Sequence, residues 1–154
     1  MKHDQLIDEY LDGPRKLREA VAAMTQEQLD ATPIPDKWST RQVICHLADY
    51  EPVFADRMKR VIAEDEPTIS GSDHQAFAVR LAYDQRDVDE DITLIQVVRS
   101  QMGRILRSLK PEDFQRKGHH STRGPITLEA LLRQITDHIP HHVKFIEEKK
   151  VTMQ

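Results

Sequence analysis

The chain has 154 residues, 38% hydrophobic and 31% charged, which is the length of one domain with enough apolar side chains for a core. A net charge of −4 argues against a basic nucleic-acid-binding surface, and a single cysteine excludes an internal disulfide. No apolar run reaches the roughly 20 residues of a membrane span, and the charged first ten residues do not resemble a signal peptide. We therefore expect one cytoplasmic domain over residues 1–154 that binds neither membrane nor nucleic acid.

Apolar residues recur at helical spacing along most of the chain. They predict a first helix over about residues 6–24, with a kink or a split at Gly13-Pro14, because a proline there has no N–H to bond to the Tyr10 carbonyl. A capping box at Thr25–Gln28 predicts a short helical turn. A second capping box at Ser39–Gln42 predicts the start of another long helix.

The helical pattern lapses between about residues 64 and 90, which contain a proline, a glycine and many acidic side chains. A structureless stretch of this length inside a compact domain is usually functional or a crossover. Helical spacing returns from about Asp91 to Leu109 and again from Thr127 to Ile146, and no segment alternates as a strand does. The sequence therefore predicts an all-α four-helix bundle with a long crossover between helices two and three.

Histidine is frequent, with eight in the chain. His138 and His142 are four residues apart, which places their side chains on one helical face, with Cβ atoms roughly 5–6 Å apart. Both continue the inward apolar stripe of the fourth helix, and His46 lies on the inward stripe of the second. Three imidazoles inside a bundle can hold a divalent metal and leave positions open, as in catalytic zinc sites. The alternative is a set of core histidines satisfied by acidic side chains and backbone groups.

The segment Pro35–Asp49, which reads PDKWSTRQVICHLAD, resembles the second-helix signature of the DinB-like (damage-inducible protein B) superfamily, and more narrowly its YfiT-like branch. The stretch Glu66–Ile69 and the ending His138–His142 are similar to that branch too, and the resemblance spans about residues 6–146. It implies that His46 and the first and last histidines of the H-x-x-H-H ending bind the metal. It also implies homodimers, and either a metal-dependent hydrolase or a bacillithiol transferase.

Two loops depart from the pattern of the branch. Its crossover usually carries Tyr-Asp-Glu-x-x-Trp, where this chain has Ser72–Phe77, which reads SDHQAF. The loop before its last helix usually reads His-Pro-Glu-Arg-Gly, where this chain has His120–Gly124, which reads HSTRG. Because this chain lacks aromatic and acidic groups that the branch has in these loops, the resemblance supports the metal site but does not identify the substrate.

Several charged residues near the predicted ligands are weaker candidates. Asp49 and Asp137 either orient an imidazole or act as general bases, or they are solvated acids on a helix flank. Arginine suits planar anions such as carboxylates. The two loops therefore supply candidate substrate-binding residues: Asp73, His120 and Arg123, together with His74. The alternative is that these are ordinary polar loop residues.

Five other positions carry expectations of their own. Cys45 is rotated by about 100° from the next residue on its helix, so we expect a small buried or half-buried side chain rather than a ligand. Pro52 and Pro140 should each bend their helix, which either widens the bundle into a pocket or has no chemical role. Two histidines outside the triad, His3 and His141, are expected at the surface.

The hypothesis for function is a metal-dependent enzyme that acts on a small-molecule substrate. Zinc is the expected ion, and Ni²⁺ or Fe²⁺ are alternatives because they also accept imidazole. The ion would activate either water, for hydrolysis, or a low-molecular-weight thiol, for S-transfer or isomerisation. Two non-enzymatic alternatives stay open: a metal- or small-ligand-binding stress protein, and a helical interaction module with packed histidines.

Overall fold

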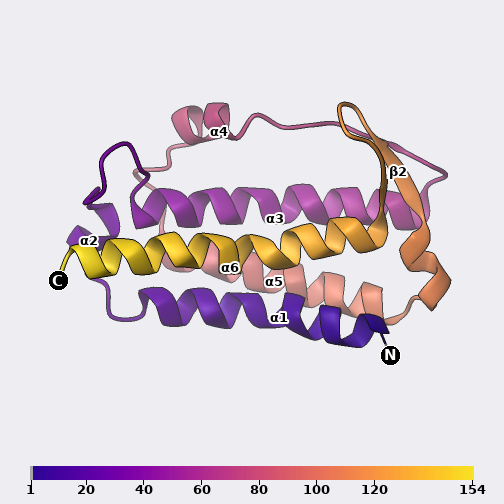
Figure 1. Cartoon of the computed structure of the whole chain (residues 1–154), viewed down its shortest axis with the longest axis horizontal. Helices are drawn as coiled ribbons and strands as arrows, with labels where there is room; N and C mark the ends of the chain where they lie inside the picture. Colours follow the sequence, from indigo (N-terminus) through magenta and orange to yellow (C-terminus); the bar gives the residue numbers. More distant parts are fainter. Residues whose placement is uncertain (1) are drawn as a thin grey trace.

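The computed structural model describes residues 2–154 and is dominated by four long helices (Figure 1). They are α1 (Lys2–Val21), α3 (Thr40–Ala63), α5 (Val88–Arg107) and α6 (Leu128–Thr152). Both α1 and α3 pack against α5 and α6, so α1 and α3 lie diagonally across the bundle. The predicted all-α four-helix bundle is confirmed.

The chain travels the length of the bundle between α3 and α5. Figure 1 shows residues 64–87 returning along the outside from the end of α3 to the opposite end of the bundle, so that α3 and α5 run in the same direction. This segment is the predicted crossover, but it is not structureless. It contains β1 (Thr68–Ile69) and α4 (His74–Arg80), and the Asp73 carboxylate caps α4 by accepting hydrogen bonds from two of its backbone N–H groups.

A small three-stranded sheet, which the sequence did not predict, lies at the end of the bundle where α6 begins. β1 pairs in parallel with β2 (Lys117–His120), and β2 forms an antiparallel hairpin with β3 (Gly124–Thr127). Gly118 permits this close pairing, because a Cβ there would lie 2.9 Å from the Pro67 backbone oxygen. Strands of two to four residues are too short for a two-residue alternation to show in the sequence.

Local capping fixes where the helices begin. The predicted capping boxes that open at Thr25 and Ser39 are both present and start α2 (Gln26–Asp30) and α3. Thr127 caps α6 as predicted. The α5 helix begins at Val88 rather than at Asp91, because the Asp87 side chain accepts a hydrogen bond from the first turn and extends the helix backwards.

Two hydrophobic clusters fill the bundle. The cluster nearer the sheet includes Met58, Phe114 and Leu132, and the other includes Leu17 and Ile44. Burial of these apolar side chains is the main source of stability for such a bundle. The candidate ligands lie on helices that contribute to both clusters, so their backbone positions are fixed by packing on either side.

Arg99 on α5 is fully buried and joins all four long helices. Its guanidinium donates hydrogen bonds to the Glu51 carboxylate on α3 at 2.9 Å, and to the backbone oxygens of Tyr10 on α1 and Ile135 on α6 at 2.7 and 2.8 Å. The α1 helix continues through Pro14, so the predicted split does not occur. A buried cation with this many acceptors ties the helices into one arrangement.

His3 is buried, so the expectation of a surface residue was wrong. Its ring stacks on Phe114 with centroids 3.9 Å apart, and its Nε2 atom lies 3.5 Å from a carboxylate oxygen of Glu129. Phe114 belongs to the 3₁₀ helix η1 (Pro111–Gln115), which folds back over the start of α1. Because this contact joins segments far apart in sequence, residue spacing along the first helix could not predict that His3 is buried.

Candidate metal centre

His46, His138 and His142 come together between α3 and α6. Their candidate ligand atoms all lie within 4.8 Å of one another, and the Nε2 atoms of His46 and His138 are 3.0 Å apart. Ligand nitrogens around a tetrahedral zinc ion, each at ~2.1 Å, would be about 3.4 Å apart. The three imidazoles therefore fit a divalent ion with small side-chain rotations.

Burial keeps the three imidazoles uncharged at neutral pH. It lowers the pKa of His46 to about 4, that of His142 to about 3 and that of His138 to about 2, from an ordinary value of 6.5. The positive charge that each ring would place next to the others adds to this effect. A neutral imidazole is the form that offers a ring nitrogen to a metal.

The second ring nitrogens do not support a purely structural role. Within residues 2–154, the Nδ1 atoms of His46 and His138 are buried and have no hydrogen-bond partner. Core histidines normally satisfy their buried nitrogens through acids, backbone groups or water. The alternative of histidines satisfied by carboxylates and backbone therefore does not describe these two rings.

Aromatic rings surround His46. Trp38, ahead of α3, lies 5.2 Å from it between ring centroids, and Tyr50, one turn farther along α3, lies 5.0 Å from it. His74, from the start of α4, covers it at 6.0 Å. Rings on these sides limit the access of water and lower the local dielectric constant, which strengthens electrostatic interactions in the site.

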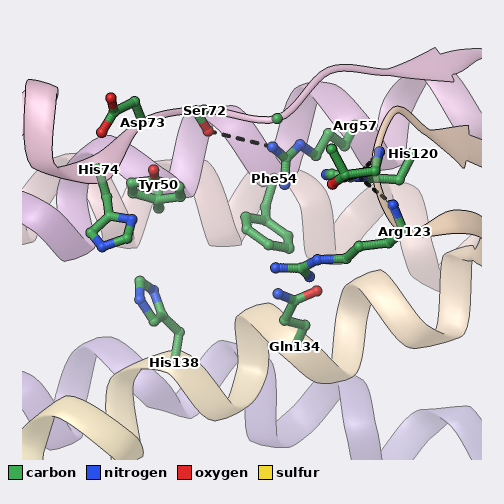
Figure 2. A pocket seen from close by; sticks show the side chains of 12 residues that line it. Tyr50, Phe54, Arg57, Ser72, Asp73, His74, His120, Arg123, Gln134 and His138 are labelled. Carbon is green, nitrogen blue, oxygen red and sulfur yellow. Dashed lines mark hydrogen bonds between the residues drawn. The ribbon is translucent and has the colours of Figure 1, made fainter.

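A cavity of about 690 Å³ opens beside His138, between α3, the crossover, the β2–β3 turn and α6 (Figure 2). The candidate substrate-binding residues predicted from the two loops all line it: Asp73, His120 and Arg123, as well as His74. Segments far apart in sequence thus place polar side chains around one space that reaches the triad.

A second cavity, of about 270 Å³, opens beside His142, one helical turn farther along α6. Trp38 and Phe145 give it an aromatic wall, and its charged lining is balanced, with two lysines and two acids: Lys37, Lys149, Asp36 and Glu148. The candidate metal centre is therefore flanked by two separate cavities, each of which contains one of the α6 histidines.

Residues 9–146 match the sequence pattern of the DinB superfamily. The chain belongs to the DinB superfamily. This confirms the resemblance inferred from the second-helix signature and the H-x-x-H-H ending, and the matched residues include all three histidines of the triad.

Relatives within the superfamily share most of the chain. YfiT of Bacillus subtilis, a candidate metal-dependent hydrolase, is 34% identical over 147 residues, which cover 94% of this chain and 82% of YfiT. A protein of Oceanobacillus iheyensis with the same designation is 31% identical over 143 residues, covering 93% of this chain and 83% of that protein.

Two solved structures share the fold of this chain. The YfiT structure, which has an unusual four-helix bundle topology, superposes with a TM-score of 0.91 at 32% identity and covers 97% of this chain and 86% of YfiT. A mycothiol-dependent maleylpyruvate isomerase superposes with a TM-score of 0.71 at 9% identity, over 91% of this chain and 58% of that protein. At that identity, the second likeness concerns the fold alone.

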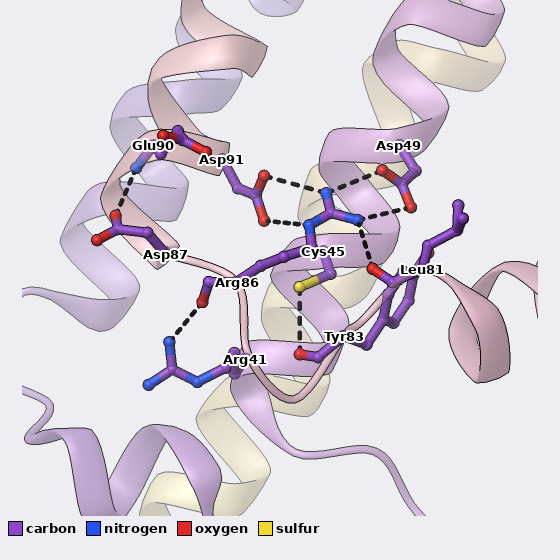
Figure 3. Close-up of polar contacts among 9 residues, drawn as sticks. All are labelled: Arg41, Cys45, Asp49, Leu81, Tyr83, Arg86, Asp87, Glu90 and Asp91. Atoms are coloured by element: carbon purple, nitrogen blue, oxygen red, sulfur yellow. Dashed lines mark hydrogen bonds and ion pairs between the residues drawn. The ribbon is translucent and has the colours of Figure 1, made fainter.

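Asp49 belongs to an ion-pair network rather than to the triad (Figure 3). Both of its carboxylate oxygens accept hydrogen bonds from Arg86, at 2.8 and 3.0 Å, and the same guanidinium binds Asp91 on α5. The network fastens the end of the crossover to α3 and α5. Neither oxygen of Asp49 reaches the buried Nδ1 of His46, so the orienting contact considered from the sequence is absent among the described residues.

Cys45 is buried, as predicted, and is kept as a thiol. Its Sγ donates a hydrogen bond to the Tyr83 backbone oxygen at 3.4 Å, and burial raises its pKa to about 12 (Figure 3). Cys45 is not part of the histidine cluster, and a protonated thiol is a poor metal ligand and a poor nucleophile.

The remaining predicted positions lie outside the cavity beside His138. Asp137 is exposed on α6, and His141 is exposed as predicted, with its ring against that of His142. Both α3 and α6 continue through their internal prolines, and Pro140 faces α1 rather than the triad. Among residues 2–154, no helix is both long and apolar enough to cross a bilayer.

Two cavity residues, Arg57 and Gln134, were not among the predicted candidates. Arg57 lies three helical turns after His46 on the same face of α3, because eleven residues correspond to about 1,100°. Gln134 lies one turn before His138 on α6. Polar residues on the helical faces of the predicted ligands were thus the signal that could have identified both.

Proposed function

We propose that this chain is a metal-dependent enzyme that holds one divalent ion on His46, His138 and His142 and acts on a small-molecule substrate. The observation that carries the proposal is the convergence of three neutral imidazoles, one buried and two half-buried, at the wall of a cavity. Three protein ligands with an accessible face are typical of catalytic rather than structural sites. The designation of YfiT as a candidate metal-dependent hydrolase supports the same class.

Zinc is the ion we propose, because three neutral nitrogen ligands in a site of this size suit it, with Ni²⁺ or Fe²⁺ as the alternatives. When bound, the ion supplies Lewis-acid chemistry that makes a water molecule or a thiol a stronger nucleophile at neutral pH. The protein holds the ligands neutral, shields them with the rings of Trp38 and Tyr50, and orients the substrate in the cavity beside His138.

His74 is the residue we propose for proton transfer. Its side chain lines the cavity, faces His138 across it in Figure 2, and is exposed enough to exchange protons with water. Imidazole suits this task because its ordinary pKa is near neutrality. Asp49 and Asp137 receive no such role here, since one is paired with Arg86 and the other lies on the exposed flank of α6.

A thiol-dependent transfer or isomerisation is the second candidate, and the pair of cavities favours it. A transfer reaction needs room for two reactants next to the ion, and the cavities beside His138 and His142 provide two compartments. The fold is shared with a mycothiol-dependent isomerase, which supports extending thiol use to this chain as part of the proposal.

The test is turnover with and without metal. Zinc-loaded protein and protein stripped with a chelator are assayed against p-nitrophenyl esters, and against an aromatic chloride together with cysteine, coenzyme A or bacillithiol. Turnover that needs the metal and is lost in His138→Ala supports the proposal, and the substrate that reacts separates hydrolysis from thiol transfer. A protein that binds zinc without any turnover would instead be the non-catalytic binding protein.

The homodimer implied by the family resemblance is also a proposal. Leu94 and Val97 lie one turn apart on α5 and are 40% and 61% exposed, which provides an apolar stripe for a second copy. Light scattering on wild type and on Val97→Glu measures the mass: a dimer that the substitution dissociates supports the proposal, and a monomeric wild type contradicts it.

A further inference from the structure

Two arginines face the cavity beside His138 from different parts of the chain. Arg57 comes from α3, and Arg123 comes from the turn between β2 and β3. Among the described residues, neither guanidinium lies within 4 Å of a carboxylate oxygen. Within residues 2–154, the cavity wall therefore carries two cations that are not directly paired with a carboxylate.

Arg57 differs from the other buried arginines in this respect. Buried Arg41 is paired with Asp30 and buried Arg99 with Glu51, and even half-buried Arg86 is paired with two aspartates. A buried charge without a partner costs several kcal/mol, so proteins normally supply one. Arg57 is only 9% exposed and lacks such an acid in the described part of the chain, which indicates that its counterion is a ligand.

The Arg57 side chain is held in place with part of its hydrogen-bonding capacity free. Its Nη2 atom donates to the Ser70 backbone oxygen at 2.9 Å and, at 3.4 Å, to the Ser72 hydroxyl, and its guanidinium lies 4.9 Å from the centre of the Phe54 ring. The Nε and Nη1 groups make no hydrogen bond within residues 2–154. A guanidinium with free N–H groups in a fixed plane binds carboxylate or phosphate oxygens well.

His120 adds a neutral donor beside the two arginines. Its Nδ1 atom accepts hydrogen bonds from the backbone N–H groups of Thr122 and Arg123 at 3.2 and 3.3 Å, so the ring proton is on Nε2. Burial and the charges of Arg57 and Arg123 lower the pKa of His120, which keeps the ring in this form. The ring thus contributes an N–H group to the same wall of the cavity.

The arginine end of the cavity lies at a distance from the triad. Figure 2 shows Arg57, His120 and Arg123 at one end, with His74 and His138 at the other. One carboxylate oxygen of Asp73, which also lines the cavity, accepts hydrogen bonds from two backbone N–H groups of α4. A ligand in this space therefore meets cations at one end and the imidazoles at the other.

We propose that Arg57, Arg123 and His120 form a subsite that binds an oxyanion, a carboxylate or a phosphate group, of the substrate. This assignment rests on the proposed function in that it places the remainder of the substrate toward the triad. The substrate class is then a small acid whose anionic group is fixed at one end of the cavity while its reacting group faces His138. The subsite itself needs no metal.

The experiment is a calorimetric titration of metal-free protein with succinate, inorganic phosphate and the uncharged succinamide. Succinate or phosphate should bind and succinamide should not, and the probe that binds identifies the anion as a carboxylate or a phosphate. Arg123→Gln and Arg57→Gln should each weaken binding by about tenfold or more. Arg60→Gln, an exposed change on the next turn of α3, is the matched control and should leave the affinity unchanged.

Three outcomes would overturn the subsite: no binding of either anion, equal binding by Arg123→Gln, or binding that requires zinc and disappears in His138→Ala. If Arg57→Gln unfolds, Arg123→Gln together with Arg57→Lys, which keeps a charge, still decides the question. Metal content is measured on the same samples. Anion binding by a protein that takes up no metal would refute the proposed function and leave the subsite standing.

Discussion

The Arg99 guanidinium donates a hydrogen bond to the backbone oxygen of Tyr10, the carbonyl that loses its helical N–H partner because Pro14 stands four residues later. Gly13 completes this arrangement, since a Cβ there would overlap the Arg99 guanidinium. Gly13 and Pro14 therefore form a site on α1 that accommodates a buried cation from α5: Gly13 leaves room for the guanidinium, and Pro14 leaves a carbonyl free to accept its hydrogen bond. A feature that suggests a break in the helix instead forms a contact between helices.

Gly13→Ala should destabilise the protein by about 1–3 kcal/mol, although alanine favours helix, because Arg99 is held by several acceptors and cannot move away cheaply. Gly103→Ala is the matched change, since the added methyl would meet only the flexible end of Leu11 and should cost less. Urea unfolding of both variants makes the comparison. An equal or greater loss of unfolding free energy in Gly103→Ala would contradict this role of Gly13.

Removing the acid that pairs with Arg99 should be severe. Glu51→Ala leaves a fully buried cation without its carboxylate, and we expect a loss of about 3–5 kcal/mol. The double variant Glu51→Leu with Arg99→Met removes both charges and should recover part of that loss. Thermal unfolding of the single and double variants measures it, and a double variant no more stable than Glu51→Ala would show that the pair is not the cause.

The helices and their starts could be predicted because they depend on neighbours in sequence. Ser39 and Gln42 form a capping box within one turn, and His138 and His142 share a face because four residues make about one turn. The sheet could not be predicted in this way. Its strands are very short, and Thr68 pairs with His119, which is distant in sequence.

The candidate site shows the same division between local features, which the sequence predicts, and tertiary features, which it does not. The triad follows from helical faces, whereas the cavity depends on where the crossover lies relative to the β2–β3 turn, and that depends on tertiary contacts. Arg57 illustrates the limit: its position on the face of His46 is visible in the sequence, but its lack of a carboxylate partner is visible only once the chain is folded.

Metal-free protein should lose stability in mild acid. The triad histidines have pKa values of about 2 to 4 in the folded protein and 6.5 when unfolded, so the unfolded chain binds protons first. Stability is then fully present above pH 6.5 and falls as the pH drops below it, by about 2 kcal/mol per imidazole between pH 7 and 5. Urea midpoints across this range measure how steeply stability changes with pH. The slope should be smaller in His138→Gln. An unchanged slope would contradict the assignment of the effect to the triad.

Asp49→Asn should weaken the fold without affecting metal binding. Arg86 would lose one of its two carboxylate partners, and we expect a loss of about 1–3 kcal/mol. Because Asp49 makes no contact with the triad, the metal content of the purified variant should equal that of wild type. Loss of metal with unchanged stability would show instead that Asp49 acts on the site.

The most direct test of the account is the metal content of untagged protein, measured by elemental mass spectrometry. Wild type should contain about one divalent ion per chain, and His46→Ala, His138→Ala and His142→Ala should each lose it. His141→Ala, an exposed neighbour on the same helix, should retain it. A wild type that carries no ion, and whose melting temperature does not rise when zinc is added, would contradict the metal centre.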